Sequence, residues 1–221
     1  MTTPLLPGSV QNAAPGLSGF DTNTVLNATS ASCFVNNGYA FCFRYLSRGH
    51  GQQPGDLSYT EAKTILESGL ALGAVQHVSM PGWTPSASLG TEYGTNAAYN
   101  AASIGLPAGM NLWMDLEGIA SGTSAQTVIA YSNAWYDAVF AAGYIPGIYV
   151  GANCILTGDQ LYNSLKYQHY WKSLSQVPSI PVRGYQLVQS FSKDPVCGVS
   201  IDKDSTMTDQ SGGTVLWLKM G

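Results

Sequence analysis

The chain has 221 residues, which suits one large domain, and 45% of them are hydrophobic, enough for a sizeable core. Only 10% are charged, far fewer than the ~25% of an ordinary soluble domain. The formal net charge is −4 without a basic cluster, which excludes the electrostatic pattern of a nucleic-acid-binding protein. No apolar stretch reaches the ~18 residues of a membrane span. A surface made polar by Gly, Ser, Thr, Asn and Tyr favours neutral, hydroxyl-rich partners.

The amino-terminal residues 1–16 are rich in proline and small residues. They lack the basic segment and the continuous apolar run of a signal peptide. We interpret them as an extended arm that leads into a single domain over residues 17–221.

Strand and helix patterns alternate along the first two-thirds of this domain. Ser58 and Glu61 have the spacing of a capping box, which predicts a helix beginning near residue 59. The predicted strands are 17–21, 39–46, 71–79, 110–117, 145–151, 169–173, 183–190, 198–202 and 214–220. The predicted helices are 30–38, 57–70, 94–107, 124–144 and 157–167.

This alternation implies parallel strands covered by helices. About eight such strands in ~200 residues favour a closed α/β fold, a TIM-like (β/α) barrel, over an open sheet. No G-x-G-x-x-G motif follows the first strand, which argues against a dinucleotide-binding fold. Helical patterns fade in the last third, so we expect the barrel to be irregular there.

Four carboxylates fall at the ends of predicted strands: Asp21, Asp115, Glu117 and Asp202. Reactive residues of such barrels lie at the carboxyl ends of strands. Several carboxylates facing one pocket suit the cleavage of a glycosidic bond. That reaction needs a protonated acid for the leaving oxygen and a negative group that stabilises the oxocarbenium-like transition state. Like-charged neighbours raise the pKa of one member and keep it protonated near neutral pH.

The same region carries a series of short motifs in a characteristic order: GFDTN, FRYL, GLPAG, MDLEG, GYIPGIYVG, YQLVQ and GVSID. This order resembles the bacterial glycoside-hydrolase-like domain, which is similar to the family 25 lysozymes (muramidases). The resemblance implies a glycosidase that acts on peptidoglycan-type amino-sugar glycan. It implies Glu117 as the general acid, and Asp115 as the residue that stabilises the substrate's acetamido group or the developing positive charge. It matches Asp21 and Asp202 to two further site aspartates.

Candidate substrate contacts come from aromatic residues near strand ends, which can stack on sugar rings, and from positions that the resemblance matches. Where family 25 enzymes often carry a lysine on the second strand, this chain has Arg44 and Tyr45. The set of candidate substrate contacts is Tyr149, Arg44, Tyr45, His77, Trp113, Trp171 and Gln186.

The three histidines are far apart in sequence and the cysteines include no CxxC pair, so we expect neither a metal site nor a cofactor. Cys33, Cys42, Cys154 and Cys197 would permit one or two disulfides, and we favour buried free thiols. The glycine-rich segment 49–55 lacks the Lys-Ser/Thr of a phosphate-binding loop, so we interpret it as a barrel loop.

Two alternatives to hydrolysis stay open. The barrel could hold glycan without cutting it, or it could be a structural module of a phage particle or secreted toxin. We expect a monomer that reaches the cell wall by secretion or delivery, without a recognisable signal peptide.

Overall fold

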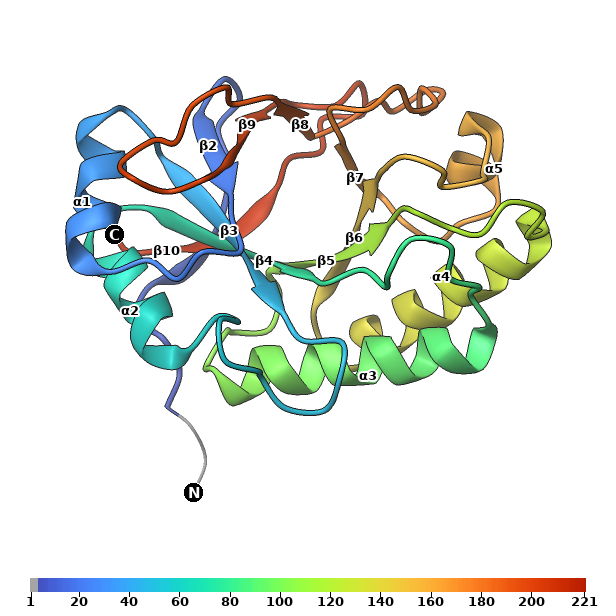
Figure 1. The fold of residues 1–221 in the computed structure, drawn as a ribbon, viewed down its shortest axis with the longest axis horizontal. Helices are drawn as coiled ribbons and strands as arrows, with labels where there is room; N and C mark the ends of the chain where they lie inside the picture. The colour runs from blue at the N-terminus through green and yellow to red at the C-terminus, as the bar shows by residue number, and fades with distance from the viewer. Residues whose placement is uncertain (1–3) are drawn as a thin grey trace.

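The computed structural model describes residues 4–221, which form ten β-strands and five α-helices (Figure 1). The strands are β1 (Ser9–Asn12), β2 (Ser18–Asp21), β3 (Phe41–Leu46), β4 (Ala71–Gln76), β5 (Asn111–Leu116), β6 (Ile145–Val150), β7 (His169–Lys172), β8 (Leu187–Ser190), β9 (Asp202–Thr206) and β10 (Leu216–Lys219). The helices are α1 (Ala28–Asn36), α2 (Tyr59–Glu67), α3 (Ala87–Ser103), α4 (Ala125–Ala141) and α5 (Gly158–Asn163).

Eight of these strands form a closed ring in the order β4-β3-β2-β9-β8-β7-β6-β5, because β5 pairs back with β4. The predicted TIM-like α/β barrel is therefore confirmed. The strands from β2 to β8 all pair in parallel with one another. Strand β9, which lies between β2 and β8, runs antiparallel to both.

The prediction of a strand over residues 198–202 is wrong, because β9 runs over Asp202–Thr206 instead. Parallel neighbours need a crossover, usually a helix, to bring the chain back to the starting edge. The segment between β8 and β9 makes no such crossover. The chain stays at the edge where β8 ends, and β9 runs back antiparallel to β8.

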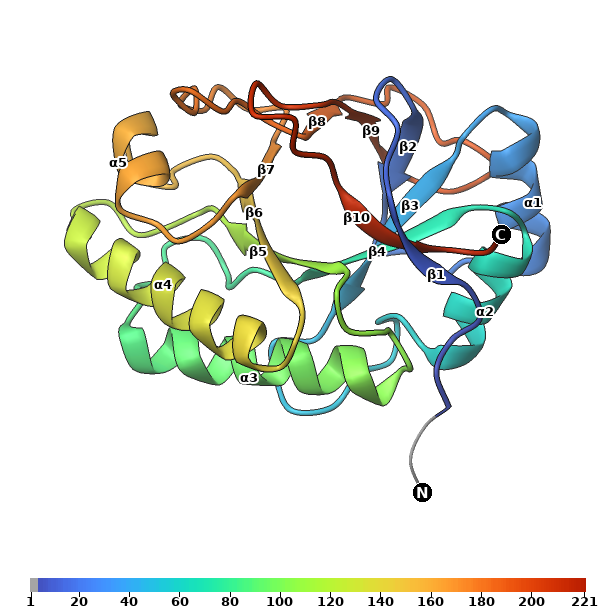
Figure 2. The same cartoon turned by 180° about the vertical axis from the view of Figure 1, so that it is seen from behind.

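The predicted arm contributes a strand to the sheet. β1 pairs antiparallel with β10, and β10 pairs with β4 through Leu218 and Leu72 (Figure 2). Leu6 is buried, and its backbone N–H donates to the carbonyl of Gly105. The described part of residues 1–16 is thus packed onto the barrel.

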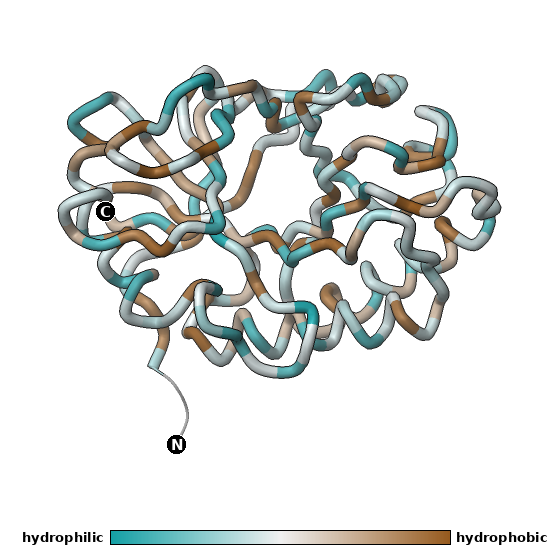
Figure 3. Tube along the Cα trace, in the orientation of Figure 1, coloured by the Kyte–Doolittle hydropathy of each residue, from teal (hydrophilic) through white to brown (hydrophobic). Residues whose placement is uncertain are grey.

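Aromatic rings fill the barrel interior: Phe41, Phe43, Trp113, Trp171 and Trp217 are all buried there. Strand β6 makes room for this packing at Gly147, where a Cβ would lie 2.5 Å from the Trp113 ring. A second core lies between the strands and the helices, and the hydropathy trace shows hydrophobic stretches along the central strands (Figure 3). No helix within residues 4–221 combines the length and the apolar composition needed to cross a membrane.

A polar side chain caps the amino end of each described helix; these caps are Asn27, Ser58, Ser86, Ser124 and Thr157. Each accepts a hydrogen bond from a backbone N–H that would otherwise lack a partner. Ser58 does cap α2, as predicted, but the Glu61 side chain turns inward to Arg44 instead of completing a capping box. Helix α3 begins at Ala87, seven residues before the predicted start, after its cap Ser86.

A disulfide joins Cys33 on α1 to Cys197 in the loop between β8 and β9. The prediction of free thiols is therefore wrong for these two cysteines. Cys42 and Cys154 are free and buried, in agreement with that prediction. The paired cysteines are 164 residues apart, so local sequence spacing carried no signal for the bond.

Candidate active site

The four strand-end carboxylates of the sequence analysis gather around one opening of the barrel. A cavity of about 380 Å³ is lined by Asp21, Asp115, Glu117 and Asp202 together with Tyr45 and His77. A smaller cavity of about 100 Å³ shares the four acids and adds Tyr149, Trp171 and Gln189. The barrel thus brings residues from β2, β5 and β9 to one site.

Asp21 and Asp202 face each other across the antiparallel pair of β2 and β9. The Asp21 carboxylate accepts hydrogen bonds from the Tyr45 hydroxyl at 2.9 Å and from the Gln189 amide at 2.8 Å. The same amide lies 3.5 Å from Asp202. Tyr149 donates its hydroxyl to the Gln189 oxygen at 2.9 Å, which fixes the direction of the amide. Gln189 therefore bridges two like-charged groups.

Glu117 follows directly after β5, and the loop between β4 and α3 holds its backbone. The indole N–H of Trp83 donates to the Glu117 carbonyl at 2.8 Å. Gly151, after β6, leaves room for the Glu117 side chain, because a Cβ there would lie 2.5 Å from both Glu117 Cβ and Glu117 Oε2. The side chain is only partly buried, so it can meet a molecule in the cavity.

Asp115 lies deeper in the site and is buried. Its Oδ1 atom is inaccessible to solvent and has no hydrogen-bond partner. A buried polar atom without a partner is costly for stability. The Asp115 residue nevertheless lines both cavities, so its carboxyl lies within reach of a ligand that can donate a hydrogen bond.

Burial raises the pKa values of all four acids, and the charges of neighbouring acids add to this effect for Asp21, Asp115 and Glu117. Burial, followed by the charges of Glu117 and Asp21, raises the pKa of Asp115 well above its ordinary value. Burial, followed by the charge of Asp202, raises the pKa of Glu117, and burial raises that of Asp202. For Asp21, burial raises the pKa to about 6 despite the hydrogen bonds from Gln189 and Tyr45. The site therefore retains protons at a pH where isolated carboxyls have lost them.

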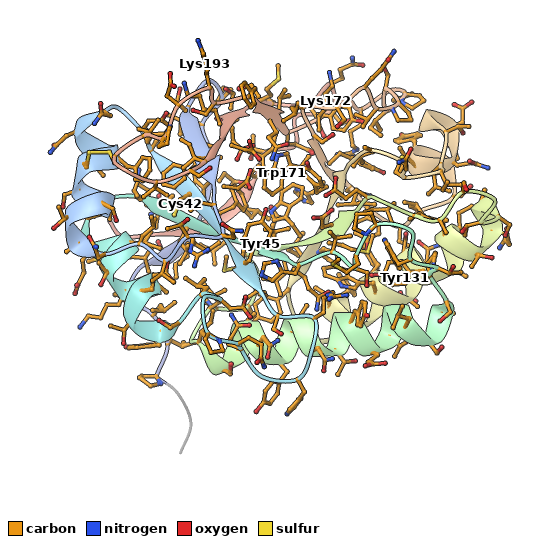
Figure 4. The ribbon with its side chains drawn as sticks, in the orientation of Figure 1. Cys42, Tyr45, Tyr131, Trp171, Lys172 and Lys193 are labelled. Carbon is orange, nitrogen blue, oxygen red and sulfur yellow. A yellow bond between two sulfur atoms is a disulfide. The ribbon has the colours of Figure 1, made fainter. Side chains whose placement is uncertain are left out.

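Four of the predicted substrate contacts line the two cavities: Tyr45, His77, Tyr149 and Trp171. Tyr45 stacks on His77 with ring centroids 4.5 Å apart, and His77 Nε2 lies 2.9 Å from Asp56 Oδ1. Figure 4 shows Tyr45 and Trp171 near the middle of the molecule, whereas Lys193 points outward at its edge.

Three predicted substrate contacts do not line either cavity. Arg44 is fully buried on the other face of β3, where it pairs with Glu61 at 2.6 Å. Trp113 is fully buried in the aromatic interior. The Gln186 side chain bonds to Tyr170 and Asp209, away from the acids. We remove these three from the candidate substrate contacts.

Sequence reasoning missed Gln189 and the buried Asp204. Gln189 is the last but one residue of β8, so its place at a carboxyl end is the signal that favours it over Gln186. Asp204 accepts a hydrogen bond from the Trp171 indole at 2.9 Å. Burial, followed by the charge of Asp21, raises the pKa of Asp204 well above its ordinary value.

A family model described as the Rv2525c-like, glycoside hydrolase-like domain matches residues 32–205 of the chain. No curated protein sequence matches the chain. The match covers the strands and loops that carry three of the four acids, and it agrees with the resemblance stated from the sequence.

Several solved structures share the fold. The chain is similar to the Tat-secreted protein Rv2525c of Mycobacterium tuberculosis, in complex with L-tartrate, at a TM-score of 0.68 and 17% identity over 90% of this chain and 98% of that one. It is similar to the bacterial lysozyme from Streptomyces coelicolor at a TM-score of 0.60 and 17% identity, over 91% and 94% of the two chains. It is also similar to a family 25 glycosyl hydrolase from Bacillus anthracis, at a TM-score of 0.61 and 12% identity, over 90% of this chain and 94% of that one.

Proposed function

The chain belongs to the Rv2525c-like glycoside hydrolase-like family, and we propose from this premise that it hydrolyses peptidoglycan-type amino-sugar glycan by carboxylic acid catalysis. The observation that carries the proposal is the meeting of Asp21, Asp115, Glu117 and Asp202 around one cavity. Their pKa values are raised, which favours a protonated carboxyl of the kind that cleavage of a glycosidic bond requires.

Glu117 is the proposed general acid. Its side chain is more exposed than that of Asp115, and burial, followed by the charge of Asp202, raises its pKa and so favours the protonated form. It donates its proton to the glycosidic oxygen as the bond to the sugar carbon breaks and positive charge develops on that carbon. Water then adds to the carbon, and the Glu117 carboxylate accepts the proton that this water releases.

Asp115 is the proposed partner of the substrate's acetamido group. Its carboxyl lines the cavity and can accept a hydrogen bond from the acetamido N–H. The hydrogen bond and the developing positive charge both favour the ionised carboxylate, which opposes the effect of burial on its pKa. Asp21 is held in place by Tyr45 and Gln189 and faces Asp202 across the strand pair, so these two acids extend the negative wall of the site.

A second candidate function is the binding of glycan without cleavage. One observation favours it, because Asp115 is buried and its raised pKa favours the neutral carboxyl. A neutral carboxyl offers a hydrogen bond but no counter-charge for the transition state. In this candidate the cavity holds a sugar and Glu117 donates a hydrogen bond rather than a proton.

We also propose that the protein acts outside the cytoplasm. The disulfide between Cys33 and Cys197 is typical of an oxidising compartment. The similar Rv2525c protein is Tat-secreted, which supports the same location.

The test is the release of reducing ends from purified insoluble peptidoglycan, with sedimentation of bound protein measured in parallel. We expect release by the natural protein and a loss of at least about 100-fold in Glu117→Gln, the usual range for removing a general acid. Glu67→Gln, an exposed position on α2, is the matched control and should retain release. Undiminished release by Glu117→Gln would contradict the assignment, and sedimentation without release by the natural protein would establish binding alone.

A further inference from the structure

A third cavity of about 340 Å³ adjoins the acid site. His77 and Val78 line both cavities, which therefore adjoin, and the two together are called the cleft. The third cavity is also lined by Arg48 and Asp56, within the loop between β3 and α2. This loop contains the glycine-rich segment 49–55, to which the sequence analysis assigned no function.

Arg48 differs from the other two arginines of the chain. Arg44 pairs with Glu61 and Arg183 pairs with Asp209. Within residues 4–221, no carboxylate lies within salt-bridge distance of Arg48, and Ser79 is the one acceptor of a hydrogen bond from its guanidinium. The guanidinium lies over the Tyr93 ring, 5.9 Å from the centroid. Since a guanidinium carries five N–H donors, most of those of Arg48 are free to bind a ligand.

The loop that carries Arg48 is held rigidly against α3. Asn96 donates its amide to the Arg48 carbonyl at 2.8 Å. The fully buried Asn100 donates to the carbonyls of Ser47 and Gly49 and accepts from the N–H of Gly51 at 2.8 Å. A fixed loop loses little conformational freedom when a ligand binds, which favours affinity.

The other charged group of this cavity is already satisfied. Asp56 accepts from the backbone N–H of Gln53 with one oxygen and pairs with His77 through the other. Beyond His77 the cleft contains only carboxyls as charged groups among its described lining residues. An acidic ligand therefore meets no cation there, whereas it is attracted at Arg48.

We propose that the cavity at Arg48 is a subsite for the carboxylate of an acidic sugar, next to the sugar that the four acids hold. A carboxylate matches the planar donor fork of a guanidinium. This inference rests on the proposed function and makes it more specific, because it selects glycans with a carboxylate-bearing unit over neutral amino-sugar polymers. The unpaired arginine gives the cleft a polarity, with the acids at one end and the cation at the other.

The experiment compares two soluble probes by titration calorimetry. One is a tetrasaccharide of alternating N-acetylglucosamine and N-acetylmuramic acid, which carries two carboxylates, and the other is its dimethyl ester, which has a similar shape without the negative charges. The full chain carries Glu117→Gln so that neither probe is consumed. We expect the free acid to bind about tenfold more tightly than the ester, as for one charge-assisted bidentate contact.

Adding Arg48→Gln should bring the ratio of the two affinities to about one, and Arg48→Lys should give an intermediate ratio because it keeps the charge without the fork. Lys63→Gln, which removes an exposed cation on α2, should leave the ratio unchanged. Equal binding of acid and ester by the Arg48 protein, or a preference that survives Arg48→Gln, would overturn the subsite while leaving glycan binding intact. Failure of both probes to bind would contradict the proposed function together with the subsite.

Discussion

The first two-thirds of the barrel and its last third build the same rim in different ways. From β2 to β7 the chain moves between parallel strands, mostly through helices, and Asp21, Asp115 and Glu117 follow the usual rule by lying at carboxyl ends. From β8 to β9 a loop without a helix makes the connection, the strand direction reverses, and Asp202 stands at the start of its strand. The rim therefore depends on which edge a residue occupies, whatever the direction of its strand.

The two regions also contribute different chemistry. The regular part supplies the proposed acid Glu117 and its neighbour Asp115. The irregular part supplies Asp202, whose charge adds to the effect of burial on the pKa of Glu117, and Gln189, which fixes Asp21. The irregular third thus sets the electrostatic conditions under which the regular part can react.

The largest expected effect comes from cutting the covalent link between the two regions. The disulfide closes a loop of 164 residues, and removing such a bond costs about 5 kcal/mol in the chain-entropy account. We expect a reductant to lower the free energy of unfolding of the natural protein by that amount, which appears as a lower urea midpoint. The double variant Cys33→Ser/Cys197→Ser should already be destabilised and should not respond to reductant. An unchanged midpoint on reduction would mean that packing alone holds the last third.

The second effect is a loss of stability with rising pH. The pKa of Asp21 rises from 3.8 to about 6 on folding, so the folded state holds a proton that the unfolded state releases. Its contribution is complete below about pH 4 and is lost by pH 7, which amounts to about 3 kcal/mol. Urea unfolding at pH 4.5 and 7.5 measures about 2 kcal/mol of this change, because part of the contribution is already lost at pH 4.5. Asp115→Asn, which replaces another buried acid with a group that does not titrate, should stabilise the protein at pH 7.5 more than at pH 4.5, and an equal effect at both would contradict the raised pKa of Asp115.

The third effect tests how tightly the regular part holds its acid. Gly151→Ala places a methyl group against Glu117 Cβ and Oε2 and displaces the carboxyl. We expect the release of reducing ends from peptidoglycan to fall by roughly tenfold or more, as when a reacting group moves by about 1 Å. Binding of the protein to peptidoglycan should be less affected. Unchanged release would show that Glu117 does not act from the position seen here.

The smallest effect concerns the backbone of the same residue. Trp83→Phe removes the indole N–H that bonds to the Glu117 carbonyl and keeps most of the ring. A hydrogen bond of this kind contributes about 0.5–1.5 kcal/mol, so we expect a loss of stability of that size in urea unfolding. A loss well above this range would mean that packing of the indole, not its hydrogen bond, is the main contribution.

The sequence predicted the barrel and the meeting of its four acids because both follow from local rules. Strand and helix periodicity alternates plainly up to β7, and carboxyl ends of parallel strands share one edge. The reversed β9 was beyond these rules, because Asp202 ends an apolar run in the sequence while it begins the strand in the structure. The bond between Cys33 and Cys197 depends on tertiary packing alone.

Side chains on the other face account for two of the three rejected substrate contacts, Arg44 and Gln186; the third, Trp113, lies in the aromatic interior. Alternation along a strand tells which residues share a face, but not which face turns inward. On β3, Tyr45 faces the cavity and its neighbour Arg44 faces the helices, where Glu61 neutralises it. Gln189, within β8, faces the acids, whereas Gln186, just before β8, does not. Each choice needed the assembled sheet.

The most direct test of the link between the two regions is a side-chain carbon-13 NMR titration of Glu117 in the natural protein and in Asp202→Asn. The account predicts a lower pKa for Glu117 in the variant, because the negative charge across the barrel has been removed while the shape of the side chain is kept. An unchanged pKa for Glu117 would contradict the account, since it would show that burial alone holds the proton and that the irregular third plays no part in the chemistry.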